Sequence, residues 1–140
     1  MKVEINPAYC RFSDAIKSIP DVFDKEGETI YKGRNQLKLF CFQGEDFVVK
    51  SFKIPHFINK FAYSFIRLSK ARRSYEHGLL LRTKGINTPE PIAYIESKKF
   101  GLLNDSYYIS KYLDYDETMH ELGAGKLEGR EEFLRSFSLF

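Results

Sequence analysis

Residues 28–52, ETIYKGRNQLKLFCFQGEDFVVKSF, decide the fold. Two glycine-containing turn signals, at 33–35 and 44–46, divide this stretch into three segments rich in strand-forming residues. We expect strands at 28–32, 36–43 and 47–52. In the middle segment, Leu37, Leu39 and Cys41 alternate with the side chains between them. The stretch therefore predicts three consecutive strands joined by two short turns.

The residues upstream predict two short elements. Residues 2–5 alternate polar and apolar side chains, which is typical of a strand. A short helix is expected to be capped by Ser13 and to be stopped by Pro20, because proline has no backbone N–H to donate within a helix.

A long helix is predicted downstream, from about Phe57 to Lys84, where apolar residues recur at three- and four-residue steps. A break near Ser69 into two helices is the alternative to one continuous helix. Gly85 is expected to cap the C-terminus of the helix. Segments 92–96 and 107–113 predict two further strands. The order of these elements predicts an α+β fold, with an antiparallel sheet of about five strands and one long packed helix.

Composition and length are those of one globular domain. The chain has 140 residues, of which 43% are hydrophobic and 29% are charged. Its apolar stretches are too short to span a bilayer, and its start lacks the apolar run of a signal peptide, so we expect a cytoplasmic protein. The two cysteines and three histidines are scattered, which predicts reduced thiols and no metal site.

Lys50 follows two valines on the third predicted strand. A hairpin with a glycine turn precedes it, and a helix and two strands follow it. This order is the layout of the N-terminal lobe of the protein-kinase fold, in which the lysine of the third strand binds nucleotide phosphates and pairs with a helical glutamate. A solvated surface lysine is the alternative.

Four segments of the chain belong together: GETIYKGRN (27–35), VVKSF (48–52), SKARRSYE (69–76) and GINTPEPIA (85–93). In this order they resemble the lipopolysaccharide core kinases, the Kdo/heptose kinase group. The segment at 85–93 is also similar to small bacterial and RIO-type kinases and to aminoglycoside phosphotransferases. The resemblance implies an N-terminal extension (1–26), a kinase-like N-lobe (27–113), and a hinge linker with the start of a C-lobe helix (114–140).

The resemblance also implies a nucleotide site for ATP. It assigns Lys50 to the phosphates and backbone groups of the hinge to adenine. The full G-x-G-x-x-G pattern is absent from the hairpin that would cover the nucleotide. Basic side chains of the hairpin would compensate by attracting the phosphates with their charge. The alternative is that the hairpin is a plain tight turn without a role in binding. The hairpin residues are Lys32, Gly33 and Arg34, and the hinge residues are Lys111, Tyr112 and Leu113.

The helical partner of Lys50 is left open between two residues. Related kinases place an acid at the position of Ser74, whereas this chain has Glu76 two residues later. Two residues correspond to about 200° around a helix, so the two positions lie on different faces. Either the helix is rotated and Glu76 reaches Lys50, or Glu76 is a surface acid.

No catalytic residue is predicted in this chain. The C-lobe of a kinase supplies a catalytic Asp, an Asn and a second Asp that holds magnesium, and no H-x-D-like loop follows Leu113. ATP and Mg²⁺ are therefore implied for the full-length family, which would phosphorylate a Kdo or heptose hydroxyl, and the chain alone is expected to be inactive. The apolar residues near its end are expected to need cover from a C-lobe or a second copy; they include Phe133, Leu134 and Phe137.

Charge distribution favours a second hypothesis. Residues 51–84 contain eight basic residues and one acid, and 114–132 contain seven acids and two basic residues. A noncatalytic, pseudokinase-like module would use Lys70, Arg72 and Arg73 to bind lipid A, the inner-membrane surface or a protein. A solvated helix face is the plainer interpretation. No nucleic-acid-binding motif is present, so nucleic acid is not expected as a partner.

Overall fold

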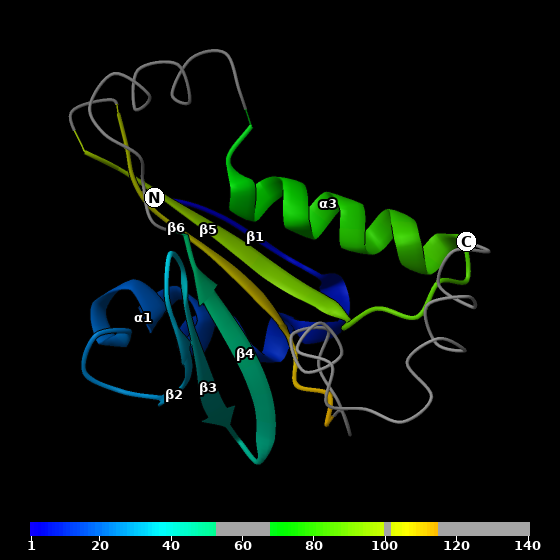
Figure 1. Ribbon diagram of the computed structural model, residues 1–140, viewed down its shortest axis with the longest axis horizontal. Coiled ribbons are helices and arrows are strands. Elements are labelled where there is room, and N and C mark those ends of the chain that lie inside the picture. Colours follow the sequence, from blue (N-terminus) through cyan, green and yellow to red (C-terminus); the bar gives the residue numbers. More distant parts are fainter. Residues whose placement is uncertain (53–67, 100–101, 115–140) are drawn as a thin grey trace, which may run out of the picture.

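The computed structural model describes residues 1–52, 68–99 and 102–114, which form one sheet with helices on both faces (Figure 1). The expected linker and C-lobe helix at 114–140, beyond Asp114, lie outside the described residues, as does most of the helical pattern before Leu68. The strands are β1 (Lys2–Ile5), β2 (Glu28–Lys32), β3 (Gln36–Phe42), β4 (Glu45–Ser51), β5 (Pro91–Lys99) and β6 (Leu102–Lys111). The helices are the 3-10 helix η1 (Pro7–Phe12), α1 (Ser13–Val22) and α3 (Lys70–Thr83).

The sheet confirms the predicted fold class, α+β with the layout of a kinase N-lobe. Its order is β1-β5-β6-β4-β3-β2, and every neighbouring pair is antiparallel. Three consecutive strands, a helix and two strands follow one another as expected. The described sheet has six strands instead of about five, because β1 pairs with the edge of β5, with Val3 opposite Ile95.

Turn chemistry fixes the boundaries of β3 and β4. The turn between them places Gln43 at φ 52° and Gly44 at φ 80°, in the left-handed region that glycine tolerates best. The pairing then runs without interruption from Phe42 opposite Glu45 to Gln36 opposite Ser51. Local sequence therefore sets the register of the strand pair that carries Lys50.

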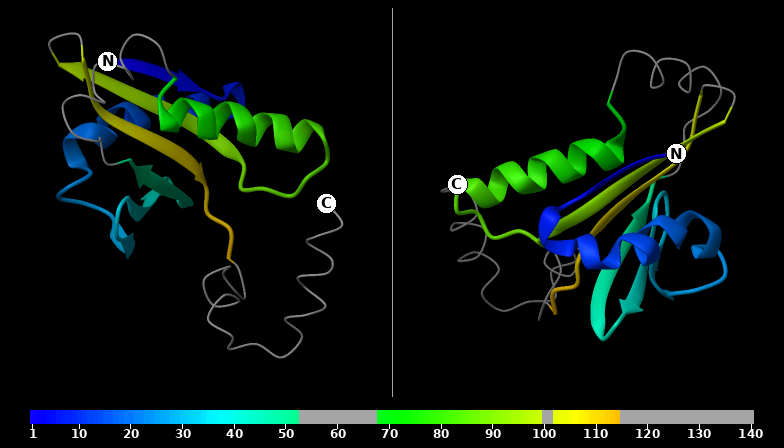
Figure 2. Two further views of the ribbon diagram at one scale, coloured as in Figure 1. Left: turned by 45° about the horizontal axis from the view of Figure 1, so that its top comes forward. Right: turned by 180° about the vertical axis from the view of Figure 1, so that it is seen from behind.

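One face of the sheet is covered by η1 and α1 (Figure 2). Phe12, Ile16, Ile19 and Phe23 are buried against the sheet. Their partners are apolar side chains from β3, β4, β5 and β6, which include Phe40, Phe47, Val49, Ile92, Ile95 and Ile109. Residues 2–23 thus share a hydrophobic core with the lobe that the resemblance placed at 27–113.

Pro20 does not end α1, contrary to the sequence expectation, because the helix continues through it to Val22. Proline deprives the turn of a single N–H donor near the end of the helix, and burial of Ile16 and Ile19 holds that turn against the sheet. Ser13 is also not the cap, since η1 runs directly into α1 and Phe12 occupies the N-cap position without a side-chain bond.

The opposite face is covered in part by α3, which packs on β5 and β6. Ser69 caps this helix by accepting a hydrogen bond from the Arg72 N–H, so the expected continuous helix over 57–84 is wrong and the helix begins near the alternative break at Ser69. Ala71, Tyr75 and Gly78 face the sheet. A Cβ atom on Gly78 would lie 2.6 Å from Cγ of Pro91, so glycine allows the helix to approach β5 closely.

Candidate functional site

Lys50 lies on the α3 face of the sheet, on β4, which pairs with β3 on one side and with β6 on the other. Val49 points into the core on the other face and is fully buried, so Lys50 must point to the α3 face. Its cross-strand neighbours there are Leu37 on β3 and Tyr108 on β6. Its ammonium lies 5.3 Å from the ring centroid of Phe52. Within 1–52, 68–99 and 102–114, Lys50 forms no ion pair.

A half-buried apolar strip continues from Lys50 along β3 and β4. Leu39 lies opposite Val48, and Leu37 lies opposite Lys50, so all four side chains share one face. Ser110 on β6 extends the row next to Val48. We call Leu37, Leu39 and Val48 the apolar strip, and Lys50 lies at one end of it. The sequence analysis did not assign these residues to the site, although the alternation in 36–43 already placed both leucines on one face.

The β2–β3 hairpin ends next to the Lys50 segment of β4. Gln36, the first residue of β3, lies opposite Ser51, and the Gly33 N–H donates to the Asn35 carbonyl across the turn. The predicted covering residues Lys32, Gly33 and Arg34 are all exposed at this tip. The structure thus places the hairpin tip beside the end of β4 that carries Lys50.

Tyr31 is an exposed aromatic residue on the same face. It pairs with Leu37 in the register and is 55% exposed. Lys32, in contrast, pairs with Gln36 and therefore belongs to the opposite face of the hairpin. Tyr31 was not predicted as a site residue from the sequence, although a turn at 33–35 brings Tyr31 opposite Leu37.

Glu76 pairs with Arg72 within α3, with the Arg72 Nε to Glu76 Oε1 distance at 2.6 Å. This hydrogen bond raises the pKa of Arg72. Arg72 also lies near Glu96 and near Tyr94, whose hydroxyl donates to Glu4 of β1 at 2.8 Å. The Arg72–Glu76 flank of the helix therefore lies towards Tyr94 and Glu96 of β5.

Ser74 lies on the other flank of α3. Each residue turns the helix by about 100°, so with Tyr75 facing the sheet, Ser74 and Glu76 point to opposite sides. A Cβ atom on Gly78, one turn after Ser74, would lie 3.3 Å from the hydroxyl of Tyr108, so the Ser74 flank lies towards β6. Ser74 is thus on the flank of Tyr108, the cross-strand neighbour of Lys50, and Glu76 pairs with Arg72 on the other flank.

Backbone bonds tie the predicted hinge to two strand ends. The Lys111 N–H donates to the Glu90 carbonyl at 2.9 Å, and the Tyr112 N–H donates to the Asp46 carbonyl at 3.0 Å. Leu113 follows, and within the described ranges it is the first residue after β6 whose backbone N–H is left without a hydrogen bond. Of the three predicted hinge residues, Leu113 thus retains the N–H that a ligand can use.

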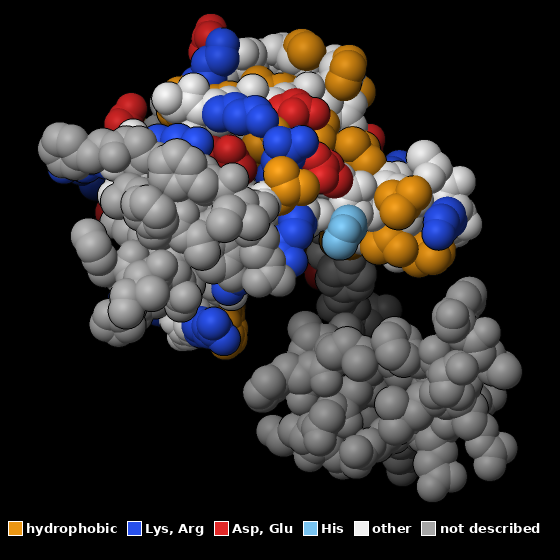
Figure 3. Space-filling model, turned by 90° about the horizontal axis from the view of Figure 1, so that it is seen from above, with side chains coloured by type: hydrophobic (Ala, Val, Ile, Leu, Met, Phe, Trp, Pro, Cys, Tyr) orange, Lys and Arg blue, Asp and Glu red, His pale blue; other side chains and the backbone are white. Residues whose placement is uncertain are grey.

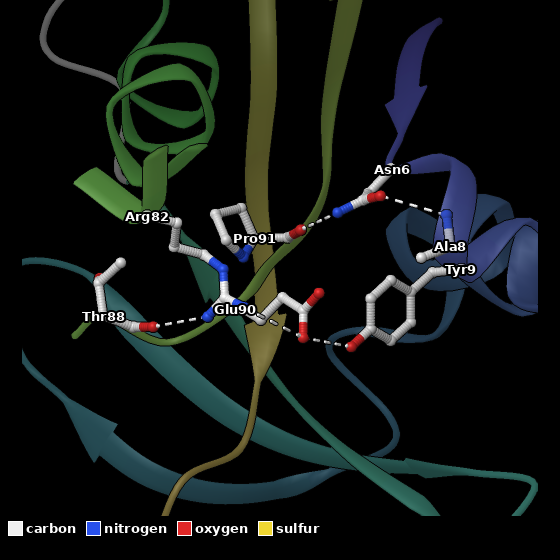
Figure 4. A network of polar contacts seen from close by, with 7 residues as sticks. All are labelled: Asn6, Ala8, Tyr9, Arg82, Thr88, Glu90 and Pro91. Carbon is white, nitrogen blue, oxygen red and sulfur yellow. Dashed lines mark hydrogen bonds and ion pairs between the residues drawn. The ribbon is translucent and has the colours of Figure 1, made fainter. Parts of the chain in front are cut away.

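A polar network surrounds the Glu90 end of this hinge (Figure 4). The Tyr9 hydroxyl donates to Glu90 Oε2 at 2.9 Å, and the Arg82 guanidinium lies 4.0 Å from the same oxygen. Burial, reinforced by the bond to Glu90, raises the pKa of Tyr9 to about 12. Tyr9 therefore stays protonated at neutral pH and acts as a donor.

The described residues do not fit a magnesium site. Mg²⁺ prefers carboxylate oxygens in octahedral geometry. Over the described ranges, no three His, Cys, Asp or Glu side chains are grouped so that they could hold a metal ion. The same residues contain no helix that is both long and apolar enough to cross a membrane.

Comparison with known proteins gives one line of evidence on the fold. No family model and no curated protein matches the chain. The solved structure of WaaP in complex with acyl carrier protein is similar, with a TM-score of 0.54 and 15% sequence identity. The match covers 94% of this chain and 48% of the WaaP chain, so this chain spans about half the length of that protein. At this identity the likeness shows the fold alone.

Proposed function

We propose that this chain is the nucleotide-binding lobe of a lipopolysaccharide-kinase-like protein and that it binds ATP on the open part of the α3 face. The adenine ring would lie against the apolar strip, with its edge at the Leu113 backbone. The phosphates would lie at Lys50, beneath the β2–β3 hairpin. The sequence resemblance and the WaaP-like fold support this placement together.

The observation that carries the proposal is the position of Lys50 at the end of the strip. Its neighbours Leu37 and Tyr108 reduce its contact with water, and no carboxylate of the described residues neutralises it. A partly desolvated cation without a partner attracts an anionic group more strongly than a fully solvated one does. A hydrogen bond to a charged group contributes about 1.5–3 kcal/mol.

Binding is proposed for this chain, and phosphoryl transfer is proposed only for a protein that also has a C-lobe. Transfer of the γ-phosphate requires a base that positions the acceptor hydroxyl and ligands that hold the metal. We propose none of the described residues for these roles. In the full-length family the acceptor would be a Kdo or heptose hydroxyl of the lipopolysaccharide core.

Calorimetric titration of the purified chain with ATP tests the proposal, with Lys50→Ala as the variant. We expect saturable binding that Lys50→Ala weakens by about tenfold to a hundredfold, which corresponds to the loss of one charged hydrogen bond. Lys17→Ala is the matched control, because Lys17 is an exposed lysine of α1 on the opposite face. Equal loss in both variants, or no binding by the parent chain, would contradict the proposal.

A noncatalytic binding module is the second candidate function. The WaaP structure contains acyl carrier protein, which makes that protein the natural probe for a protein partner. The structure gives a lipid-binding basic face less support, because Arg72 is engaged by Glu76. In the view from the α3 side, basic and acidic side chains also lie interleaved (Figure 3). Binding of acyl carrier protein that survives Lys50→Ala and fails in the double variant Arg72→Ala, Arg73→Ala would favour the module.

A further inference from the structure

We propose that Tyr9, on the N-terminal 3-10 helix, is a positioning residue for the base-binding end of the nucleotide site. Tyr9 is distant in sequence from every segment that carries the kinase resemblance. It acts through Glu90 on the backbone of the hinge. The inference rests on the proposed nucleotide site and adds a specificity element to it.

The first step is the bond between Tyr9 and Glu90. The buried phenol of Tyr9 donates to the Glu90 carboxylate at 2.9 Å. The main-chain carbonyl of Glu90 accepts a hydrogen bond from the N–H of Lys111, also at 2.9 Å. Glu90 therefore connects η1 to the hinge through its side chain and its backbone. A displacement of Glu90 moves the acceptor that holds the first hinge residue.

The second step is the anchoring of η1 itself. The Asn6 N–H donates to the Ile92 carbonyl at 2.8 Å, and the Asn6 side-chain amide donates to the Pro91 carbonyl at 3.1 Å (Figure 4). Asn6 also caps η1 by accepting a bond from the Ala8 N–H. The segment that carries Tyr9 is thus fixed to the two residues that follow Glu90, and Tyr9 is held in a defined position.

The third step extends the support to the other hinge anchor. Arg11, two residues after Tyr9, forms an ion pair with Glu45 at the start of β4. Glu45 precedes Asp46, whose carbonyl accepts the N–H of Tyr112. One short helix therefore contacts Glu90, which accepts the first hinge bond, through Tyr9, and contacts Glu45, the residue before the second acceptor, through Arg11.

Because of these contacts, we expect loss of the Tyr9–Glu90 bond to disturb the end of the site that binds the base and to leave the phosphate end unchanged. The hinge meets the strip beside Val48, because Ser110 and Lys111 pair with Val48 and Phe47, while Lys50 pairs with Tyr108 further along β6. Loss of the Tyr9 bond frees Glu90 and shifts the hinge backbone. The position of Lys50, on a strand held between β3 and β6, does not depend on it.

Three ligands separate the two ends of the site: ATP, adenosine, which has no phosphate, and inorganic triphosphate, which has no base. They are titrated into the full chain by calorimetry or by NMR. In Tyr9→Phe we expect binding of ATP and adenosine to weaken by about threefold to tenfold, the range for one lost hydrogen bond. Triphosphate binding should stay unchanged. Glu90→Gln keeps an acceptor for Tyr9 and should retain most of the affinity, whereas Glu90→Ala should behave like Tyr9→Phe.

Tyr94→Phe is the matched control. Tyr94 is also a buried tyrosine, and its hydroxyl donates to a glutamate, Glu4, at 2.8 Å, but this pair lies on the β1 side of α3. Thermal unfolding measures how much stability each variant loses. We expect Tyr94→Phe to lose about as much stability as Tyr9→Phe and to bind adenosine as the unmodified chain does.

Each other outcome overturns a distinct claim. Equal weakening of all three ligands in Tyr9→Phe, no weakening of any, or the same selective loss in Tyr94→Phe would overturn the positioning role and leave the nucleotide site standing. If the unmodified chain binds neither ATP nor triphosphate, the proposed function fails, and the inference that rests on it fails with it.

Discussion

Replacing Phe12 by alanine tests whether the N-terminal helices belong to the core of the lobe. Phe12 is 1% exposed. Its ring meets the ring of Phe47 edge-on, with centroids 5.0 Å apart and planes at 71°, and its centroid lies 6.3 Å from that of Tyr9. The substitution leaves a cavity between η1 and the central strand β4.

The expected loss is large compared with the stability of a domain. Truncation of a buried phenylalanine to alanine costs about 3–5 kcal/mol, which includes the lost burial and the cavity left behind. A domain of this size has a free energy of unfolding of about 5–15 kcal/mol. Phe12→Ala should therefore remove roughly a fifth or more of the stability of a typical domain. It should do so in a single transition, because η1, α1 and the sheet share one cluster.

Urea unfolding followed by far-ultraviolet circular dichroism measures this loss, since the chain has no tryptophan to report it by fluorescence. Leu80→Ala is the control, because Leu80 is 52% exposed on α3 and its truncation should change stability by less than about 0.5 kcal/mol. If Phe12→Ala costs no more than Leu80→Ala, residues 1–26 are an appendage of the kind that the sequence resemblance implied, and the shared core described above is wrong.

Three further perturbations have defined outcomes. Gly78→Leu should lower the free energy of unfolding by about 1–3 kcal/mol in a urea titration, because the new side chain meets the ring of the proline that opens β5; unchanged stability would show that α3 can move away from the sheet. Burial and then Asp105 raise the pKa of Tyr107 to about 12 from 10.0, so the folded state favours the protonated phenol. The free energy of unfolding should therefore be constant below about pH 10 and fall as the pH rises towards 12, and it should fall less steeply in Tyr107→Phe. A free energy of unfolding that does not change over this range would refute the raised pKa of Tyr107. Saturating ATP should slow alkylation of the exposed thiol of Cys41, which shares a face with Leu39, and leave alkylation of Cys10 on η1 unaffected, as measured by mass spectrometry. If the alkylation rates of both cysteines are the same with and without ATP, the nucleotide binds elsewhere.

The strands around Lys50 were predictable because their information is local. Turn residues at 33–35 and 44–46 and the alternation between them fix both hairpins, and β2 has the expected bounds. The pairing of β1 with β5 was not predictable, since those strands are about ninety residues apart and four alternating residues do not specify a partner. The sixth strand is a consequence of this long-range contact.

The orientation of α3 shows why the helical partner of Lys50 stayed open. Periodicity placed Tyr75 on the buried face, but which flank faces β4 depends on the approach of Gly78 to Pro91 and on Arg72 lying near Glu96. Neither contact has a sequence pattern. In contrast, the alternation of Leu37 and Leu39 with the residues between them was visible in the sequence and predicted their shared face.

The hinge illustrates a different limit. Backbone groups bind there, and a backbone N–H has no residue-specific pattern, so the sequence offered Lys111, Tyr112 and Leu113 only through resemblance. The structure differentiates them, because the first two donate to Glu90 and Asp46 within the fold. The role of Tyr9 lay beyond sequence reasoning, since it arises from a contact between residues 81 positions apart.

Methyl NMR of the purified chain during an ATP titration tests most directly whether the nucleotide lies on the Lys50 face. Leucine, valine and isoleucine methyl groups report each face of the sheet separately. We expect saturable shift changes at Leu37, Leu39, Val48 and Leu113, and none at Ile16 or Ile19, which belong to α1 on the opposite face. Changes at the α1 face, changes confined to the exposed leucines of α3, or an unaltered spectrum at saturating ATP would contradict the nucleotide site.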